Sequence, residues 1–377
     1  MPSPSNPDLF PAFPLADYLH HQKEIDAALE RTLARGHYIL GGEVAEFERE
    51  FAAFVGTRHA VGAANGTDAI ELILRALDVG AGCGVVVPSH TAVASASAVS
   101  RAGAQPVFAD VEADTCTLCP RSLAALLDSP RGKRVRAVLA VHLYGHPCDM
   151  DSLARVCGER GVVLIEDCAQ AHGATHKGRN AGALARAAAF SFYPTKNLGA
   201  IGDGGAVTTD DDALAARIRS IREYGWVRRY ISDSVGVNSR LDELQAAILR
   251  VKLRDLPARI GRRRELAGLY AELLAGCGFV TVPEVRDGCG HAYHLYVIQS
   301  PRRDALMEHL KSRGVPVALH YPAAIHQQPG YAGAAADSPA LPVTDALMPR
   351  ILTLPLHPYM TDEAVHHVCE QIRDFAG

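Results

Sequence analysis

The chain has 377 residues, a formal net charge of -4, 48% apolar residues and 21% charged residues. This is the balance of an ordinary folded protein, and the length is sufficient for a large core and two domains. The net charge argues against a nucleic-acid partner, and no apolar run has the length of a membrane span. The proline-rich residues 1–14 lack a charged segment followed by an apolar one, so we expect no signal peptide and a cytoplasmic location.

The nine cysteines are an odd number, and most of them lie in apolar segments. Cys116 and Cys119 form one CxxC pair, but no second pair and no neighbouring histidines complete a zinc site. A redox role for this pair is the alternative, although its surroundings do not resemble the strand-to-helix turn of redox pairs. We expect reduced, structural thiols and no bound metal.

From about residue 60 the chain alternates short apolar runs with helical patterns, which predicts an α/β sheet. Residues 68–77 carry four aliphatic side chains at helical spacing and are expected to form one of the helices between the strands. The buried strands are expected at residues 84–88, 105–108, 136–141, 161–165 and 187–190.

Beyond residue 210 the pattern predicts longer helices and then a change of character. The expected elements are helices at 211–224, 239–253, from 262, 302–313 and from 361, with a strand at 293–298. We therefore expect three parts: an N-terminal segment (1–25), a large domain (26–255) and a smaller α+β C-terminal domain (256–377).

Lys196 lies in the most informative stretch of the chain, residues 191–205. This glycine-rich loop follows the strand predicted at 187–190 directly. An amine held at a strand exit is partly desolvated, which favours its neutral, nucleophilic form. A lysine in such a loop is more often simply solvated, so the interpretation depends on the residues that accompany it.

Asp167 follows the strand at 161–165, and in open α/β sheets ligands bind beyond such strand ends. A carboxylate there either caps a helix or pairs with a cationic group of a bound cofactor. Residues 65–67 (Asn-Gly-Thr) precede the helix at 68–77, where free amides and a hydroxyl make an anion site; capping by Thr67 is the alternative. With the hydroxyl of Ser191, these groups match the requirements of pyridoxal 5′-phosphate (PLP).

Four motifs in this order resemble the DegT/DnrJ/EryC1/StrS aminotransferases: residues 65–69, 166–174, 191–205 and 238–247. The resemblance covers roughly residues 25–375. It implies an aspartate-aminotransferase-like α/β fold (PLP fold type I). Such a fold has a large domain with a mostly parallel seven-stranded sheet and a smaller α+β C-terminal domain.

The resemblance also implies roles in PLP chemistry for three residues. Lys196 would form the internal aldimine with the cofactor, which passes through pyridoxamine phosphate during the reaction. Asp167 would bind the protonated pyridine nitrogen. Gln170 would lie beside the ring and its 3′-oxygen.

For the cofactor phosphate, the resemblance implies contacts from Gly66, Thr67 and Ser191. Asn238 would reach the phosphate of the neighbouring subunit's cofactor, which would make a homodimer with shared active sites. A helix cap before Ser239 is the alternative for Asn238.

The chain departs from the family beside the cofactor ring. Members of the family often carry a stacking aromatic residue two positions after the place of His90, where this chain has Ala92. Either His90 supplies the stacking face, which we favour, or the ring is less tightly covered. Contacts with the sugar substrate are expected from Tyr193, His320, Tyr321 and His326; packing before Pro322 is the alternative for the last three.

The residues around Lys196 are similar to those of members that act at C3 of nucleotide-linked 3-keto-6-deoxy sugars. This implies transfer of an amino group from L-glutamate to a dTDP-linked 3-keto-6-deoxyhexose, giving an amino sugar for a polysaccharide or a secondary metabolite. Amination at C4 and a UDP-linked acceptor are the alternatives.

The sequence gives less support to three other functions. Family dehydratases replace the lysine with histidine, whereas this chain keeps Lys196. A PLP-binding regulator would carry an appended DNA-binding module, for which we see no room. A dehydrogenase would need a GxGxxG that opens a helix after an early strand.

Overall fold

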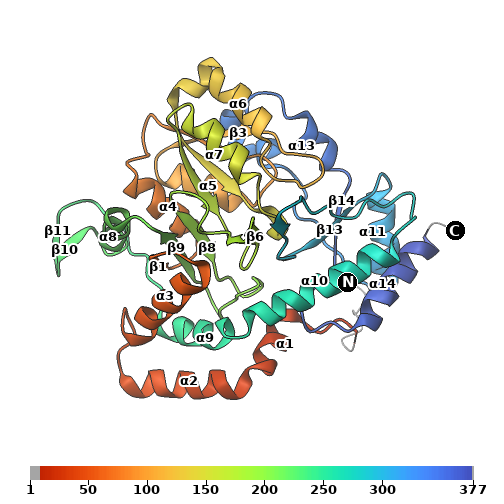
Figure 1. Cartoon of the computed structure of the whole chain (residues 1–377), viewed down its shortest axis with the longest axis horizontal. Helices are drawn as coiled ribbons and strands as arrows, with labels where there is room; N and C mark the ends of the chain where they lie inside the picture. Colours follow the sequence, from red (N-terminus) through yellow and green to blue (C-terminus); the bar gives the residue numbers. More distant parts are fainter. Residues whose placement is uncertain (1–8, 376–377) are drawn as a thin grey trace.

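The computed structural model describes residues 9–375, and its centre is a seven-stranded sheet (Figure 1). The strand order is β1-β9-β8-β5-β4-β2-β3. Within this sheet β9 runs antiparallel to β1 and β8, and the other neighbours are parallel, as predicted. The strands are β1 (His59–Ala63), β2 (Gly84–Pro88), β3 (Gln105–Ala109), β4 (Val135–Val141), β5 (Val163–Asp167), β8 (Ala188–Ser191) and β9 (Gly205–Thr209).

Both faces of the sheet are buried, because a layer of helices covers each of them. Successive side chains of each strand point to opposite faces. Val85 and Val87 face one helical layer, while Val86 between them faces the other. The first layer holds α4 (Gly66–Ala76), α5 (Val93–Arg101) and α8 (Asp212–Ile221). The second layer holds α3 (Gly42–Val55), α6 (Pro120–Asp128), α7 (Met150–Gly158) and α9 (Glu243–Leu253).

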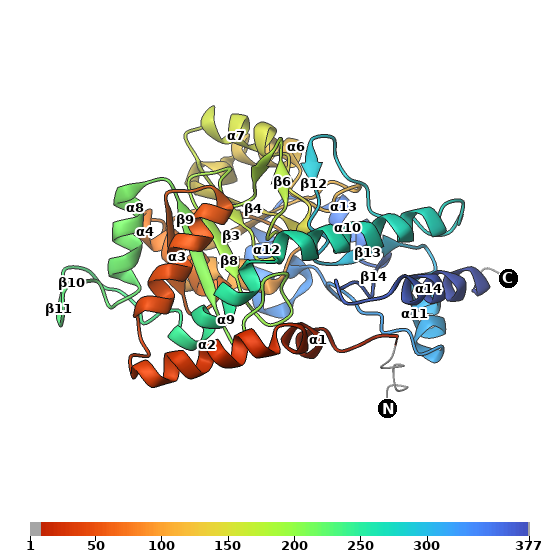
Figure 2. The same cartoon turned by 60° about the horizontal axis from the view of Figure 1, so that its bottom comes forward.

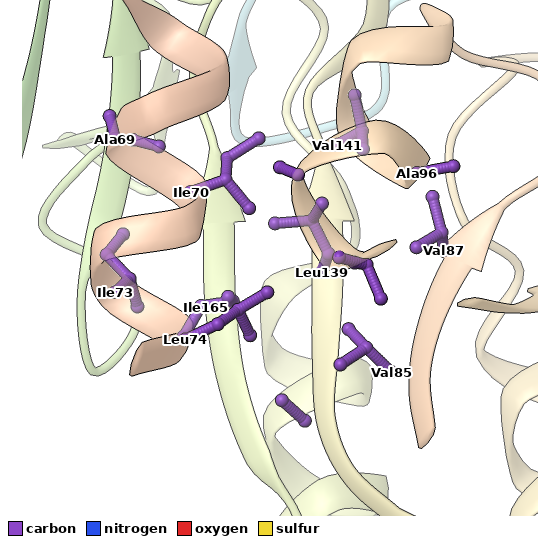
Figure 3. Packing of buried hydrophobic residues seen from close by; sticks show 14 of the residues in the cluster. Ala69, Ile70, Ile73, Leu74, Val85, Val87, Ala96, Leu139, Val141 and Ile165 are labelled. Atoms are coloured by element: carbon purple, nitrogen blue, oxygen red, sulfur yellow. The ribbon is translucent and has the colours of Figure 1, made fainter. Parts of the chain in front are cut away.

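The helix α4 shows how the sequence pattern produces this packing. Its side chains Ile70, Ile73 and Leu74 lie on one face and point at the sheet (Figure 3). The helix packs mainly on β8 and β9, and Ile70 and Leu74 extend from it towards Leu139 of β4 and Ile165 of β5 (Figure 3). The aliphatic spacing that predicted a helix is therefore the spacing that covers the central strands.

Two predicted helices begin at different residues. The helix predicted from residue 239 begins at Glu243, because the residues before it stay extended and Asp242 pairs with Ile39. The helix predicted from residue 262 begins at Leu256 as α10 (Leu256–Leu273). Pro257 lies in its first turn, where a missing amide costs no hydrogen bond.

The C-terminal elements form their own apolar cluster around α10. These elements are β13 (Tyr296–Gln299), α11 (Arg303–Ser312), β14 (Ile351–Leu354) and α14 (Asp362–Asp374). In contrast, α12 (Ala332–Ala336) and α13 (Pro342–Leu347) pack towards the large sheet. The domain boundary at residues 255 and 256 stays a prediction.

Two helices that were not predicted lie near the N-terminus: α1 (Phe13–His20) lies inside the predicted N-terminal segment, and α2 (Gln22–Arg35) runs past its predicted end at residue 25. Ile25 and Ala28 of α2 pack on Ile248 of α9, and α2 runs beside α9 (Figure 2). Residues 1–8 of this predicted segment lie outside the described residues.

Besides the antiparallel pair of β13 and β14, two small sheets complete the described structure. One is β6 (Thr175–His176), β7 (Arg179–Asn180) and β12 (Cys289–Gly290). The other is the hairpin of β10 (Trp226–Arg228) and β11 (Ile231–Ser232), which projects from the body (Figure 1, Figure 2). All nine cysteines are free thiols. Across residues 9–375, no helix has both the length and the apolarity to cross a bilayer.

Glu166 is a fully buried carboxylate on β5, on the face opposite to Asp167. It accepts hydrogen bonds from the amides of Gly182, Leu184 and Ala185 at 2.8, 2.9 and 2.9 Å, and His142 Nε2 lies 3.0 Å from it. The carboxylate thus holds the loop that leads into β8.

We expect Glu166→Gln to lower the free energy of unfolding by about 3 kcal/mol, because an amide group cannot accept all of these bonds and would face amide donors. A lower urea midpoint measures this. The control is Glu30→Gln at an exposed position of α2, for which we expect little change. Equal midpoints for the two variants would contradict the structural role of Glu166.

Candidate active site

A cavity of about 500 Å³ lies at the carboxyl ends of β4, β5 and β8, beside the first turns of α4 and α5. This is the edge of the sheet where ligands bind in open α/β folds. Seven of the predicted site residues line it: Gly66, Thr67, Asp167, Gln170, Ser191, Tyr193 and Lys196. Five do not: His90, Asn238, His320, Tyr321 and His326.

Lys196 lies in a tight loop immediately after β8. Its amide donates to the carbonyl of Tyr193, and the amide of Ala200 donates to the carbonyl of Phe192, each at 2.8 Å. Burial lowers the pKa of the Lys196 amine to about 8, although the charge of Asp167 opposes this shift. A substantial fraction of the amine is therefore neutral near physiological pH, as a nucleophilic lysine requires.

Asp167 ends β5 with only 5% of its surface exposed. Its Oδ2 accepts a hydrogen bond of 2.8 Å from the hydroxyl of Ser95, and its Oδ1 accepts one of 3.0 Å from the amide of Ala169. Both oxygens therefore have a fixed direction, and the carboxylate borders the cavity that Lys196 also lines. This is the arrangement that was predicted from the strand end and the lysine loop.

The first turn of α4 and the end of β8 form a narrow cradle at one side of the cavity. A Cβ on Gly66 would lie 2.7 Å from the Cβ of Ser191, so only glycine allows these two segments to come so close. Asn65 is the helix cap, since its Oδ1 accepts from the amide of Asp68 at 2.9 Å. The alternative that Thr67 is the cap is therefore wrong, and its side chain borders the cavity instead.

These groups fit PLP. The amides of the first helical residues have no carbonyl partner within the helix, and the hydroxyls of Thr67 and Ser191 stand beside them, which suits a phosphate. A carboxylate and an amine with a lowered pKa border the same space. These protein groups therefore match the groups of a phosphorylated aldehyde that has a basic ring nitrogen.

Gln170 links the cavity wall to the C-terminal elements. Its Oε1 accepts from the amide of Tyr144 at 2.6 Å, and its Nε2 donates to the hydroxyl of Tyr321 at 3.0 Å. Both ends of the amide are thereby fixed. Burial raises the pKa of Tyr321 to about 12, so its hydroxyl stays protonated. Tyr321 therefore acts on the cavity through Gln170.

His90 does not supply the predicted stacking face. It is 1% exposed, does not line the cavity, and has its Nε2 2.6 Å from the hydroxyl of Tyr144. That hydroxyl donates to the carbonyl of His320, so Nε2 of His90 is the donor in their bond. Burial lowers the pKa of His90 to about 4 and keeps the imidazole neutral. The cavity wall at this point is Ala92, a smaller cover than an aromatic ring.

The other two histidines also have structural partners. His320 Nδ1 lies 2.9 Å from the hydroxyl of Thr353. His326 lies between the hydroxyl of Ser89 at 2.6 Å and the carboxylate of Asp345 at 3.1 Å. Neither borders the cavity, whereas Tyr193 does and is 52% exposed. The structure therefore favours Tyr193 among the predicted substrate contacts.

Asn238 is exposed and follows the β10–β11 hairpin, where it pairs with Glu223. The alternative that it caps a helix is wrong, because the helix begins at Glu243 with Asp242 in the cap position. Asn238 does not line the cavity of its own chain.

Sequence reasoning missed Ser95 and Arg101, both on α5. Ser95 is 1% exposed and holds Asp167; the signal was a serine on the sheet-facing side of an alanine-rich helix. Arg101 borders the cavity and pairs with Asp68 and Glu71, each at 2.9 Å. Its partners lie 30 or more positions away, so no local pattern revealed them.

Comparison with known proteins identifies the family of the chain. Residues 20–373 match the DegT/DnrJ/EryC1/StrS aminotransferase family. The chain is 44% identical to the dTDP-3-amino-3,4,6-trideoxy-alpha-D-glucose transaminase of Streptomyces venezuelae, over 96% of this chain and 94% of that one. It is 46% identical to the erythromycin biosynthesis sensory transduction protein EryC1 of Saccharopolyspora erythraea, over 95% and 97%.

Solved structures also match this chain. The crystal structure of S. venezuelae DesV in complex with a ketimine intermediate has a TM-score of 0.93 and 43% identity, and 99% of each chain is covered. These similarities span nearly the whole molecule, including the sheet, the lysine loop and the C-terminal elements. The chain therefore belongs to the DegT/DnrJ/EryC1/StrS aminotransferase family and is a PLP-dependent aminotransferase.

Proposed function

We propose that this enzyme transfers an amino group from L-glutamate to C3 of a nucleotide-linked keto sugar, with a dTDP-linked 3-keto-6-deoxyhexose as the acceptor. The observation that carries the proposal is the amine of Lys196 and the carboxylate of Asp167 at one cavity. Relatives named as transaminases of dTDP-3-amino sugars, at 42–44% identity, support the acceptor.

In this mechanism PLP, when bound, would supply an electrophilic aldehyde and a ring that withdraws electrons from the carbon being deprotonated. Gly66, Thr67 and Ser191 would hold its phosphate. Asp167 would keep the ring nitrogen protonated, with its direction set by Ser95. Both roles depend on side chains that the fold has already oriented.

Lys196 would perform the proton transfers. Its neutral amine can take the proton from Cα of the donor amino acid, and its protonated form can deliver one to the sugar carbon that receives nitrogen. A lowered pKa suits both directions, because the amine then binds and releases a proton within a narrow range of pH.

A UDP-linked acceptor is the second candidate. A relative from Pseudomonas aeruginosa that is 41% identical is named a UDP-2-acetamido-2-deoxy-3-oxo-D-glucuronate aminotransferase. That name also places the keto group at C3, so it supports amination at C3. The nucleotide, dTDP or UDP, is what the experiment below distinguishes.

We also propose that the enzyme is a homodimer with shared sites, in which Asn238 contributes to the neighbouring cavity. Its exposed position beside a projecting hairpin supports this. The exposed apolar side chains of the hairpin give the same indication: Val227, Tyr230 and Ile231 are 64%, 71% and 47% exposed.

The functional test is turnover of a panel of dTDP- and UDP-linked 3-keto and 4-keto sugars with L-glutamate. We expect amino-sugar formation with a 3-keto acceptor. Lys196→Arg should reduce it by roughly 10³-fold or more, because a guanidinium stays charged and cannot transfer the proton. An enzyme that aminates only 4-keto sugars would overturn the ring position, and parental activity in Lys196→Arg would overturn the role of the lysine.

Ser95→Ala should lower kcat roughly tenfold or more while KM changes little. A hydrogen bond to a charged group is worth about 1.5–3 kcal/mol, and here the lost bond orients Asp167. Ser100→Ala is the matched control on the same helix, since its hydroxyl bonds only to the carbonyl of Ala96 within α5. The role proposed for Ser95 fails if both variants keep the parental kcat.

Subunit sharing predicts complementation. Lys196→Ala and Asn238→Ala homodimers should each be nearly inactive, whereas mixed dimers contain one intact site. After unfolding and refolding of an equimolar mixture we expect about a quarter of the parental activity. The control mixes Lys196→Ala with the double variant, which can form no intact site. No recovery in the first mixture would contradict shared sites.

A further inference from the structure

A buried group of ionised side chains lies where the N-terminal helix α1 meets the junction of α9 and α10 (Figure 2). We call Asp17, Lys252 and Arg259 the basal cluster; they are 1%, 2% and 6% exposed. Lys252 Nζ lies 2.5 Å from Asp17 Oδ2, and Arg259 Nη1 donates to Asp17 Oδ1 at 3.0 Å. One carboxylate from α1 thus faces two cations from α9 and α10.

Both cations also bind the loop that carries Lys196. Arg259 Nη1 donates to the carbonyl of Asn197 at 3.2 Å, and Lys252 Nζ donates to the carbonyl of Gly199 at 2.9 Å. These carbonyls belong to the first and third residues after the lysine. The cluster therefore holds the backbone on the side of the loop away from the cavity.

A buried ammonium needs a nearby negative charge to stay ionised, and a buried guanidinium needs one to offset its loss of hydration. Burial alone would raise the pKa of Asp17, but Lys252 and Arg259 more than offset this and lower it. Burial lowers the pKa of Lys252 even with Asp17 beside it. Without Asp17, Lys252 would release its proton more readily, and its charged bond to Gly199 would weaken.

The surroundings supply only part of this charge. Tyr359 donates its hydroxyl to Asp17 Oδ1 at 2.8 Å, which adds no charge. Asp255 pairs with Arg259 at 3.0 Å and lies 3.0 Å from His21 Nε2, but its side chain is 34% exposed. Asp17 is therefore the buried counter-charge that Lys252 and Arg259 share.

We propose that Asp17 is a positioning residue for the reaction: by balancing Lys252 and Arg259 it keeps both bound to the carbonyls that follow Lys196, and so fixes the direction of the lysine amine. The N-terminal helix is then a working part of the active site, although it does not border the cavity. This inference rests on the role proposed for Lys196.

The first test uses the protein without cofactor and measures hydrogen exchange in the peptide that contains residues 196–200. Asp17→Asn keeps the shape and removes the charge, and we expect exchange in this peptide to become roughly tenfold faster. Asp26→Asn is the matched control, because Asp26 is an exposed carboxylate of α2 bonded to the hydroxyl of Tyr18. Its exchange in this peptide should equal that of the parent.

The second test uses the enzyme loaded with PLP. In Asp17→Asn we expect kcat to fall about tenfold with KM within twofold of the parent, and the pH midpoint of the visible band of the bound cofactor to move. A merely stabilising role would lower the melting temperature and leave both the band and the exchange of residues 196–200 unchanged. That result would overturn the proposal.

Two further variants keep the test decisive if Asp17→Asn does not fold. Lys252→Met removes the donor to Gly199 and should speed exchange in the same peptide. Asp17→Asn combined with Lys252→Met restores the charge balance, so we expect melting to recover while exchange stays fast. Slow exchange in both would contradict the proposal. A parent enzyme that never turns yellow with PLP would instead contradict the role of Lys196, and the exchange result would stand apart from it.

Discussion

The site depends on one electrostatic constraint: an amine and a carboxylate share a poorly solvated space at the ends of β5 and β8. Burial pushes Lys196 towards its neutral form, and Asp167 pushes it back towards the charged form. The pKa of about 8 is the balance of these two effects. The parallel pairing of β5 with β8, in which Asp167 lies opposite Ala189, brings the two residues to one edge of the sheet.

Glycines then decide how closely the segments around this edge can approach. A Cβ on Gly205 of β9 would lie 2.4 Å from the carbonyl of Asn65. Gly66 likewise has to lack a side chain to lie against Ser191. The cradle proposed for the phosphate is therefore made by close backbone contact between α4, β8 and β9. Its hydroxyls lie around a space whose shape the backbone has set.

The sequence was a good guide wherever local pattern and function coincide. The five apolar runs predicted as strands are β2, β3, β4, β5 and β8, and the strand ends led to Asp167 and Lys196. In contrast, β1 and β9 each contain a single large aliphatic residue among glycine, alanine and polar residues, so their apolar signal is weak. The helices α1 and α2 were missed because their contacts with α9 and α10 are made across more than 200 positions.

Side-chain roles were less predictable than strand ends. Ser95 and Gln170 act through partners far away in the sequence, namely Asp167, Tyr144 and Tyr321. His90 has the residue type of a ring cover, but its Nε2 bonds to the buried hydroxyl of Tyr144, and the residue does not line the cavity. Such outcomes depend on which polar atoms need a partner after folding, which no single segment reveals.

Glu166 and Asp167 together fix the register of β5 in the sheet. Consecutive residues of a strand point to opposite faces, so a slip of one position would send the cavity carboxylate into the loop at residues 182–185 and bring the structural one into the cavity. The two carboxylates cannot replace each other, because the loop and the cavity edge require side chains of different length and present different hydrogen-bond donors. The register that satisfies the buried loop at residues 182–185 is therefore also the register that places Asp167 at the cavity.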